Sequence, residues 1–118
     1  MKNLAPEVFR QRLLIEGKYE IEVHVETVHQ FFDALLSGLE ANAAGDAIVN
    51  SSIGQGKPEN QGIEAFIPLI ESGVALYTWE LSGFISLIIY TCKAFDENKA
   101  LKIVEEFFQL SQMEFKSF

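Results

Sequence analysis

The stretch IEAFIPLIESGVALYTWELSGFISLIIYTC, residues 63–92, predicts three consecutive strands joined by short turns. The expected strands are 63–70, 74–79 and 84–91. The last of them is apolar on both faces: Phe84, Ile88 and Tyr90 on one, and Ile85, Leu87 and Ile89 on the other. A strand that is buried on both sides needs cover on both sides. We therefore expect residues 63–92 to form the centre of an antiparallel sheet.

Two helices and two short strands are predicted around this centre. A helical stripe of apolar residues runs over 28–39, with Thr27 and Gln30 as its capping box and an end expected near 42–45. Asp96 is expected to cap a second helix, whose stripe runs over 100–108. Residues 47–50 predict a short strand, and residues 113–118 predict a closing one.

The N-terminal part allows two interpretations. Pro6 suits a first helical position and Gly17 suits a helix end, which favours a helix over 1–17, with a strand over 12–15 as the alternative. Residues 19–26 alternate strictly between apolar and polar, which predicts the first strand.

The predicted order is strand–helix–strand–strand–strand–strand–helix–strand. It indicates an α+β fold, a two-layer sandwich in which two main helices cover one face of an antiparallel sheet. We expect one domain over 1–118, with 1–17 as an N-terminal extension. The apolar second face then requires cover. A homodimer is the expected answer, ahead of cover by the N-terminal helix.

Composition restricts the function. The net charge of −8 argues against nucleic-acid binding and suits a cationic ligand, although acidity also serves solubility. The longest apolar run, 87–90 with its flanks, is too short for a membrane span, and the N-terminus does not have the pattern of a secretory signal. A single cysteine suits the reducing cytoplasm. Residues 50–62 predict a long loop that does not have the spacing of a phosphate-binding loop.

Three pairs of residues stand out: Glu71-Ser72, Thr78-Trp79 and Thr91-Cys92. Taken singly, they are a turn, a strand-end aromatic and a small buried residue. Their joint spacing resembles that of the prokaryotic type of S-adenosylmethionine decarboxylase. The resemblance extends to GKYEIEVHVE (17–26), GDAIVNS (45–51) and GIEAFIPLIES (62–72).

This resemblance implies a proenzyme. In the family, a serine hydroxyl attacks the carbonyl of the preceding glutamate, and elimination cuts the chain and leaves an N-terminal pyruvoyl group. The pyruvoyl carbonyl forms a Schiff base with the substrate amine and accepts electrons during loss of CO₂. By position, Ser72 would be the pyruvoyl precursor, Glu71 its partner at the cleavage site, and Cys92 the proton donor.

Several positions depart from the family pattern. Gly73 replaces a histidine, Tyr77 stands at the position of the processing histidine, and Glu64 stands at that of an assisting serine. A phenol is a poor base at neutral pH. The Trp-Pro-Glu of the family becomes Trp79-Glu80-Leu81, which shifts an active-site acid by one position, and the loop 50–62 has no aromatic residue to stack on adenine. Glu64, Trp79 and Glu80 remain the predicted ligand-binding residues, and no metal site is expected.

The leading hypothesis is an uncleaved homologue from the lineage that supplies the aminopropyl donor for spermidine synthesis. It would keep a pocket for an amine or S-adenosylmethionine-like ligand, or bind an active paralogue. The alternative is an active pyruvoyl-dependent decarboxylase of S-adenosylmethionine or a smaller amino acid, and a purely structural dimer is a third class. The two histidines, His24 and His29, lie outside the matched motifs and are predicted to be surface residues of the first strand and the first helix.

Overall fold

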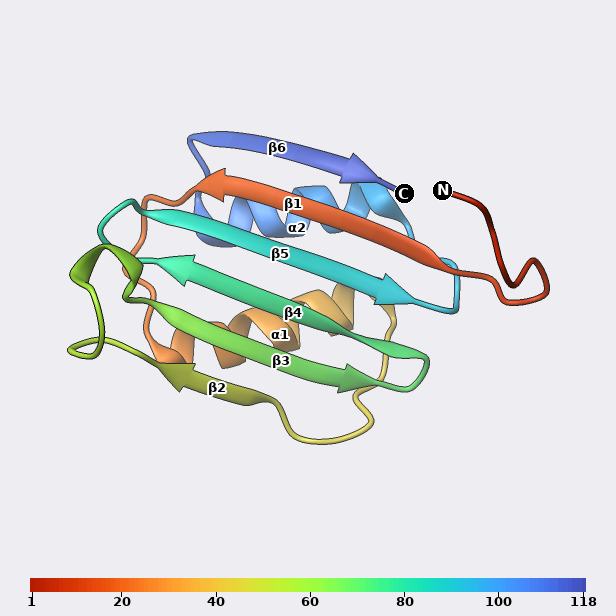
Figure 1. Ribbon diagram of the computed structural model, residues 1–118, viewed down its shortest axis with the longest axis horizontal. Coiled ribbons are helices and arrows are strands. Elements are labelled where there is room, and N and C mark those ends of the chain that lie inside the picture. The colour runs from red at the N-terminus through yellow and green to blue at the C-terminus, as the bar shows by residue number, and fades with distance from the viewer.

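In the computed structural model, which describes residues 1–118, a six-stranded antiparallel sheet has both helices on one face (Figure 1). The strands lie in the order β2-β3-β4-β5-β1-β6. The elements are β1 (Gln11–Lys18), α1 (Val25–Leu39), β2 (Ile48–Ser51), a 3₁₀ turn η1 (Pro58–Asn60), β3 (Ile63–Leu69), β4 (Ser72–Trp79), β5 (Phe84–Thr91), α2 (Glu97–Phe108) and β6 (Gln112–Ser117). The predicted α+β architecture and its order of elements are confirmed.

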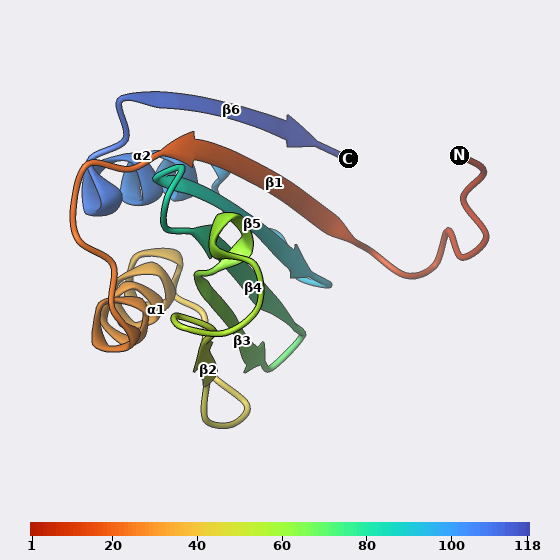
Figure 2. The same ribbon diagram turned by 60° about the vertical axis from the view of Figure 1, so that its left-hand side comes forward.

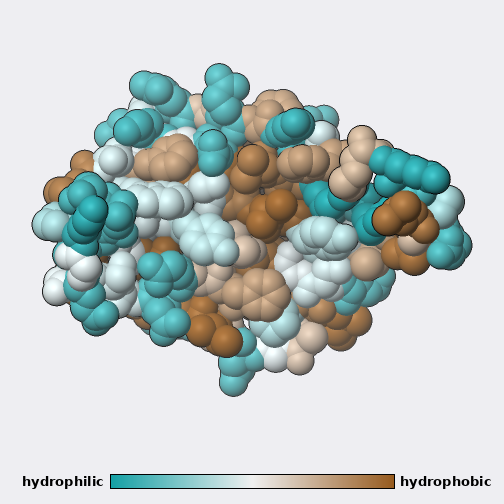
Figure 3. Space-filling view, in the orientation of Figure 1, coloured by the Kyte–Doolittle hydropathy of each residue, from teal (hydrophilic) through white to brown (hydrophobic).

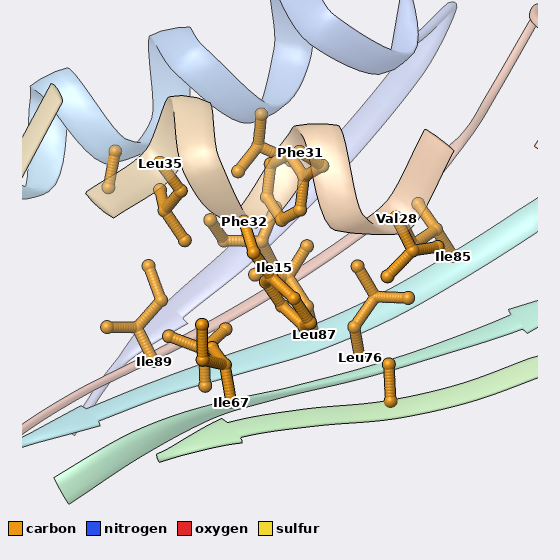
Figure 4. Packing of buried hydrophobic residues seen from close by; sticks show 14 of the residues in the cluster. Ile15, Val28, Phe31, Phe32, Leu35, Ile67, Leu76, Ile85, Leu87 and Ile89 are labelled. Carbon is orange, nitrogen blue, oxygen red and sulfur yellow. The ribbon is translucent and has the colours of Figure 1, made fainter. Parts of the chain in front are cut away.

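The core lies between the sheet and the two helices, and we call this side of the sheet the covered face. Alternate residues of each strand point into it, because side chains alternate across a strand. On β5, Ile85, Leu87 and Ile89 are all at most 1% exposed. The apolar stripe of α1 packs onto them from above (Figure 4), and its Phe31 ring also contacts Phe108 of α2, with ring centroids 4.7 Å apart.

The other side of the sheet, the open face, carries no helix. By strand register, its apolar residues are Leu14, Phe66, Ala75, Tyr77, Trp79, Phe84, Ile88 and Tyr90. Figure 3 looks onto this face and shows an apolar patch at its centre with polar residues around it. The predicted apolar second face is therefore present.

The prediction of a helix over 1–17 is wrong, and the alternative strand is right. Residues 11–18 form β1, which lies between β5 and β6. Leu13 and Ile15 are fully buried on the covered face, so the period of this segment is two. Gly17 does not end a helix. A Cβ at this position would lie 2.7 Å from the Gln112 carbonyl oxygen, so glycine permits β6 to approach closely.

The prediction of a strand over 19–26 is also wrong. Residues 19–24 have no strand partner, although Tyr19, Ile21 and Val23 do pack against the core. The alternation therefore reflects which of these side chains pack against the core. The segment does not form the strand next to β5, because β1 lies there. His24 is the N-cap of α1, and its backbone N–H donates to Thr27 Oγ1. The cap lies three residues before the predicted one.

The remaining elements follow the prediction closely. Helix α1 ends at Leu39 with Glu40 in a left-handed conformation, a few residues before the expected end. Asp96 caps α2, because its carboxylate accepts a hydrogen bond from Lys99 N–H. The short strand β2 and the closing strand β6 are both present. Neither helix is long and apolar enough to span a membrane.

Candidate functional site

A tight hairpin between β3 and β4 holds Glu71 and Ser72. Leu69 pairs with Ser72, so Ile70 and Glu71 form a two-residue turn. The φ angles are +87° at Glu71 and +131° at Ser72. Side chains rarely adopt this region, and each such residue costs about 1–3 kcal/mol. The peptide bond between these two residues is therefore held in a strained segment.

The end of β5 brings Cys92 to this hairpin. Thr91 pairs with Ser72, and the next residue, Cys92, donates its backbone N–H to the Glu71 carbonyl oxygen at 3.0 Å. The Ser72 Oγ and Cys92 Sγ atoms are 3.4 Å apart, within hydrogen-bonding distance. The structure thus brings together three residues that sequence spacing alone had grouped.

A hollow of about 330 Å³ opens beside Ser72 on the open face. It is lined by Phe66, Ser72, Gly73, Ala75, Ile88 and Tyr90. The Phe66 and Tyr90 side chains remain 43% and 38% exposed, so aromatic surface is available to a ligand or partner. A volume of this size lies at the lower end of the range for small-molecule sites.

Gly73 allows the Phe66 ring to lie directly against the backbone of β4. A Cβ at this position would lie 2.5 Å from Phe66 Cζ and 2.6 Å from Cε1, so any larger residue would displace the ring. The departure from the histidine of the family pattern thus has a structural consequence. An aromatic ring takes the space next to Ser72.

A second, smaller cavity of about 60 Å³ lies on the covered face at the same hairpin. Its lining is mostly apolar and includes Leu36 and Leu39 of α1, Val74 of β4 and Phe95. Glu71 also lines it. The bond between Glu71 and Ser72 therefore lies between a small cavity on one side of the sheet and the larger hollow on the other. No group of His, Cys, Asp and Glu side chains is arranged to hold a metal ion.

Sequence comparison identifies the family to which this fold belongs. The sequence profile described as S-adenosylmethionine decarboxylase matches residues 17–118. The chain belongs to the S-adenosylmethionine decarboxylase family. Members of this family typically use a pyruvoyl cofactor. No curated protein matches the chain in a direct sequence search.

Structural comparison supports the same fold. The crystal structure of the adenosylmethionine decarboxylase from Aquifex aeolicus VF5 is similar to this chain with a TM-score of 0.74 and 14% sequence identity. The similarity covers 94% of this chain and 89% of that one. At this identity the likeness concerns the fold alone.

The other predicted site residues of this family member lie away from Ser72. Tyr77 pairs with Glu64 on the open face, five residues along β4, which is about 17 Å at the usual strand rise. Trp79 packs on Phe84 at the far end of β4, with ring centroids 5.3 Å apart. Glu80 follows in the next turn. Within one subunit, none of these four residues lies beside the Ser72–Cys92 pair.

Sequence analysis missed Phe66 and the structural role of Gly73 as parts of the site. Phe66 alone carried no signal; it becomes informative only as part of the apolar patch that it forms with Ala75 and Ile88 on the open face. The contact between Phe66 and Gly73 could not be predicted from the sequence, because it depends on the register of β3 against β4.

Proposed function

We propose that this member of the S-adenosylmethionine decarboxylase family remains uncleaved and uses the hollow beside Ser72 to bind a small organic ligand. One observation carries the proposal: the only hydrogen-bond partner of the Ser72 side chain is Cys92. Cleavage needs a group that takes the hydroxyl proton of Ser72, and the sulfur of a thiol is only a weak hydrogen-bond acceptor. Tyr77, at the position of the processing histidine, is five residues away along β4.

The two histidines cannot replace that group within one subunit. His24 is the N-cap of α1 and His29 lies near its N-terminal end, whereas the C-terminal end of the helix, at Leu39, approaches the hairpin. Ten residues of helix separate His29 from Leu39, which corresponds to about 15 Å. Distance, as well as the substitution at residue 77, therefore supports the proposal of an uncleaved form.

The expected ligand is an organic amine or an S-adenosylmethionine-like molecule. The Phe66 and Tyr90 rings at the hollow attract cations through their faces, and the net charge of −8 favours a cationic ligand. We place the protein in the cytoplasm, where an exposed thiol such as Cys92 stays reduced. It would act in or beside the pathway that supplies spermidine.

We further propose that the open face is covered by a second copy of the chain. A sheet face with several exposed aromatic residues is unfavourable in water, and a two-fold dimer covers it symmetrically. A related, active enzyme of the family is the alternative partner for the same face.

Intact mass of freshly purified protein tests the uncleaved state. We expect one species of full length, identical in its behaviour to Ser72→Ala. Two fragments that meet at Glu71 and Ser72, the second starting with a pyruvoyl group, would overturn the proposal. Thermal shift with S-adenosylmethionine, putrescine and spermidine tests the ligand. A stabilisation that Phe66→Ala reduces is expected, and no response to any of the three would favour a purely structural dimer.

A second candidate, the active pyruvoyl-dependent decarboxylase, is favoured by the geometry of the peptide bond itself. The residues on both sides are strained, and the Cys92 N–H donates to the Glu71 carbonyl that would be attacked. Such a donor stabilises a developing negative charge on that oxygen. Ser72 would then be the source of the pyruvoyl group, which supplies the electron-accepting carbonyl. The Cys92 thiol lies where it could return a proton to the substrate carbon.

Release of CO₂ from S-adenosylmethionine and from smaller amino acids tests this candidate. Activity that disappears in Ser72→Ala, together with a cleaved chain, would establish it. Absence of CO₂ release with every substrate, from protein that remains full-length, would exclude it.

A further inference from the structure

Residues 1–10 form an arm that extends away from the body of the protein, and we call it the N-terminal arm. Figure 2 shows that it leaves the sheet on the side of the open face, away from both helices. The arm joins the sheet at Gln11, the first residue of β1, which pairs with Thr91, the residue that also pairs with Ser72. The root of the arm therefore lies at the same end of the sheet as the candidate site.

The root of the arm is held firmly. The Gln11 side-chain amide donates to the Phe95 carbonyl at 3.0 Å, and its oxygen accepts from Phe95 N–H at 3.0 Å. These two bonds, together with the β1–β5 ladder, fix the direction in which the chain leaves the sheet.

The arm also holds its own shape. The Asn3 side-chain oxygen accepts hydrogen bonds from the Ala5 N–H and from the Arg10 guanidinium. A turn is closed by Val8 N–H donating to the Ala5 carbonyl at 3.0 Å. The arm is thus a hook with a defined form and a fixed root.

The hook nevertheless presents apolar side chains to water. Leu4 is 83% exposed, Val8 42% and Phe9 54%. Each Å² of apolar surface in water costs about 25 cal/mol, so an ordered hook that buries nothing is unfavourable on its own. An ordered, exposed apolar segment indicates a surface that receives it.

We propose that, in the homodimer, the N-terminal arm of each copy lies on the open face of the other copy, with Phe9 against the hollow beside Ser72. Phe9 then becomes an outer wall of the ligand site. This inference rests on the proposed dimer of open faces. The hollow is apolar, and its lining includes Phe66, Tyr90 and Ile88.

Geometry favours the second copy over the arm's own sheet. The arm projects outward beyond the end of β1 without lying on its own sheet (Figure 2), and its internal hydrogen bonds oppose folding back. Facing sheets pack about 10 Å apart, and Phe9 lies two residues before Gln11, a backbone span of up to about 7 Å to which the length of the phenylalanine side chain is added. The arm is therefore long enough to cross to the second sheet, and two-fold symmetry gives both copies the same contact.

Disulfide trapping between two single-cysteine proteins tests the arm. Both carry Cys92→Ser, which removes the native thiol. One adds Phe9→Cys, and the other, labelled with ¹⁵N, adds Ala75→Cys at the small residue that lines the hollow. The two proteins are mixed, oxidised and analysed by intact mass. We expect a covalent heterodimer as the main cross-linked product, reversed by reductant. The matched control replaces Ala75→Cys with Leu81→Cys, an exposed position at the far end of β4, where at least fivefold less product is expected.

The outcomes separate the arm from the dimer. A protein that is monomeric in solution overturns both proposals. A dimer that gives no Phe9–Ala75 cross-link, or that cross-links equally to residue 81, overturns the arm contact and leaves the dimer standing. A double variant that forms its disulfide within one chain shows that the arm folds back, which also overturns the inference. As an independent measure, Phe9→Ser in the full chain is expected to raise the dimer dissociation constant about tenfold.

Discussion

The two faces of the sheet are built from the same strands but differ in the type and the exposure of their side chains. On β5, Leu87 points to the covered face and is 1% exposed, whereas its neighbour Ile88 lines the hollow on the open face. The covered face is filled with aliphatic side chains, and the open face carries exposed aromatic ones. The comparison indicates that the covered face supplies the stability of the fold, and it leaves the open face free for the binding and association proposed above.

The largest effect is expected on the covered face. Leu87→Ala removes a fully buried side chain of β5 from the core beneath α1 (Figure 4), and should lower the free energy of unfolding by about 2–5 kcal/mol. Urea denaturation followed by circular dichroism measures this loss.

Ile88→Ala is the matched control for Leu87→Ala, because it removes a similar side chain one residue further along the same strand. At protein concentrations where the chain is monomeric, we expect a clearly smaller loss, since Ile88 is only partly buried. Equal losses for both variants would show that the two faces contribute alike and would contradict the comparison.

The next effect concerns association through the open face. Phe66→Ser replaces an aromatic residue that is 43% exposed, and should weaken the dimer by about 1–3 kcal/mol while the circular dichroism spectrum stays unchanged. Sedimentation equilibrium gives the dissociation constant. Val25→Ser, at an exposed apolar position in the first turn of α1, is the control and should leave association unchanged. If Phe66→Ser also associates normally, the open face is not the interface.

Most of the fold could be predicted from sequence because strands β3, β4 and β5 follow one another with short turns. Neighbouring strands of this kind pair with each other, so local pattern also gives the topology. The failure at residues 11–26 has a physical cause. Residues 19–26 alternate, whereas residues 13–15 are all apolar, and only pairing with β5 and β6 decides that 11–18 is the strand.

The site was predictable to the extent that it depends on the same local pairing. Ser72 and Cys92 meet because β4 and β5 form a hairpin in a register that places Ser72 opposite Thr91. Tyr77 and Trp79 belong to the same strand as Ser72, and a strand is straight, so closeness in sequence becomes distance in space. Any role for them beside Ser72 requires a second subunit, which one sequence does not reveal.

A smaller effect tests the contact between Gly73 and Phe66. Gly73→Ala places a methyl group where the ring lies, and we expect a loss of about 1–2 kcal/mol in the free energy of unfolding as the ring is pushed aside. In the Phe66→Ala background the same substitution should cost much less. The resulting interaction energy of about 1 kcal/mol is the measure of the contact. Additive losses in the double-mutant cycle would mean that the methyl group clashes with the backbone, such as the Ile67 carbonyl at 3.1 Å, and that the ring is not held by Gly73.

The smallest effect on stability is expected at Tyr19, a partly buried residue that packs against the core. Burial, and secondarily the negative charge of Glu80, raise the pKa of the Tyr19 phenol above its ordinary value. The folded protein therefore holds this proton more tightly than the unfolded chain does. The stabilisation is fully present below about pH 10, the ordinary value for tyrosine, and is lost as the pH rises through the higher pKa of the folded state.

Urea midpoints at pH 8 and pH 11 measure this dependence for the wild type, Tyr19→Phe and Glu80→Gln. Lysines also titrate in this range, so the informative quantity is the difference between variants. Tyr19→Phe should lose less stability over the interval than the wild type does. Glu80→Gln should fall between them, because it removes the secondary cause and keeps the burial. An identical decline in wild type and Tyr19→Phe would show that the phenol is solvated in the folded state. Tyr19 would then contribute to the exposed surface of the molecule and not to the core of the covered face.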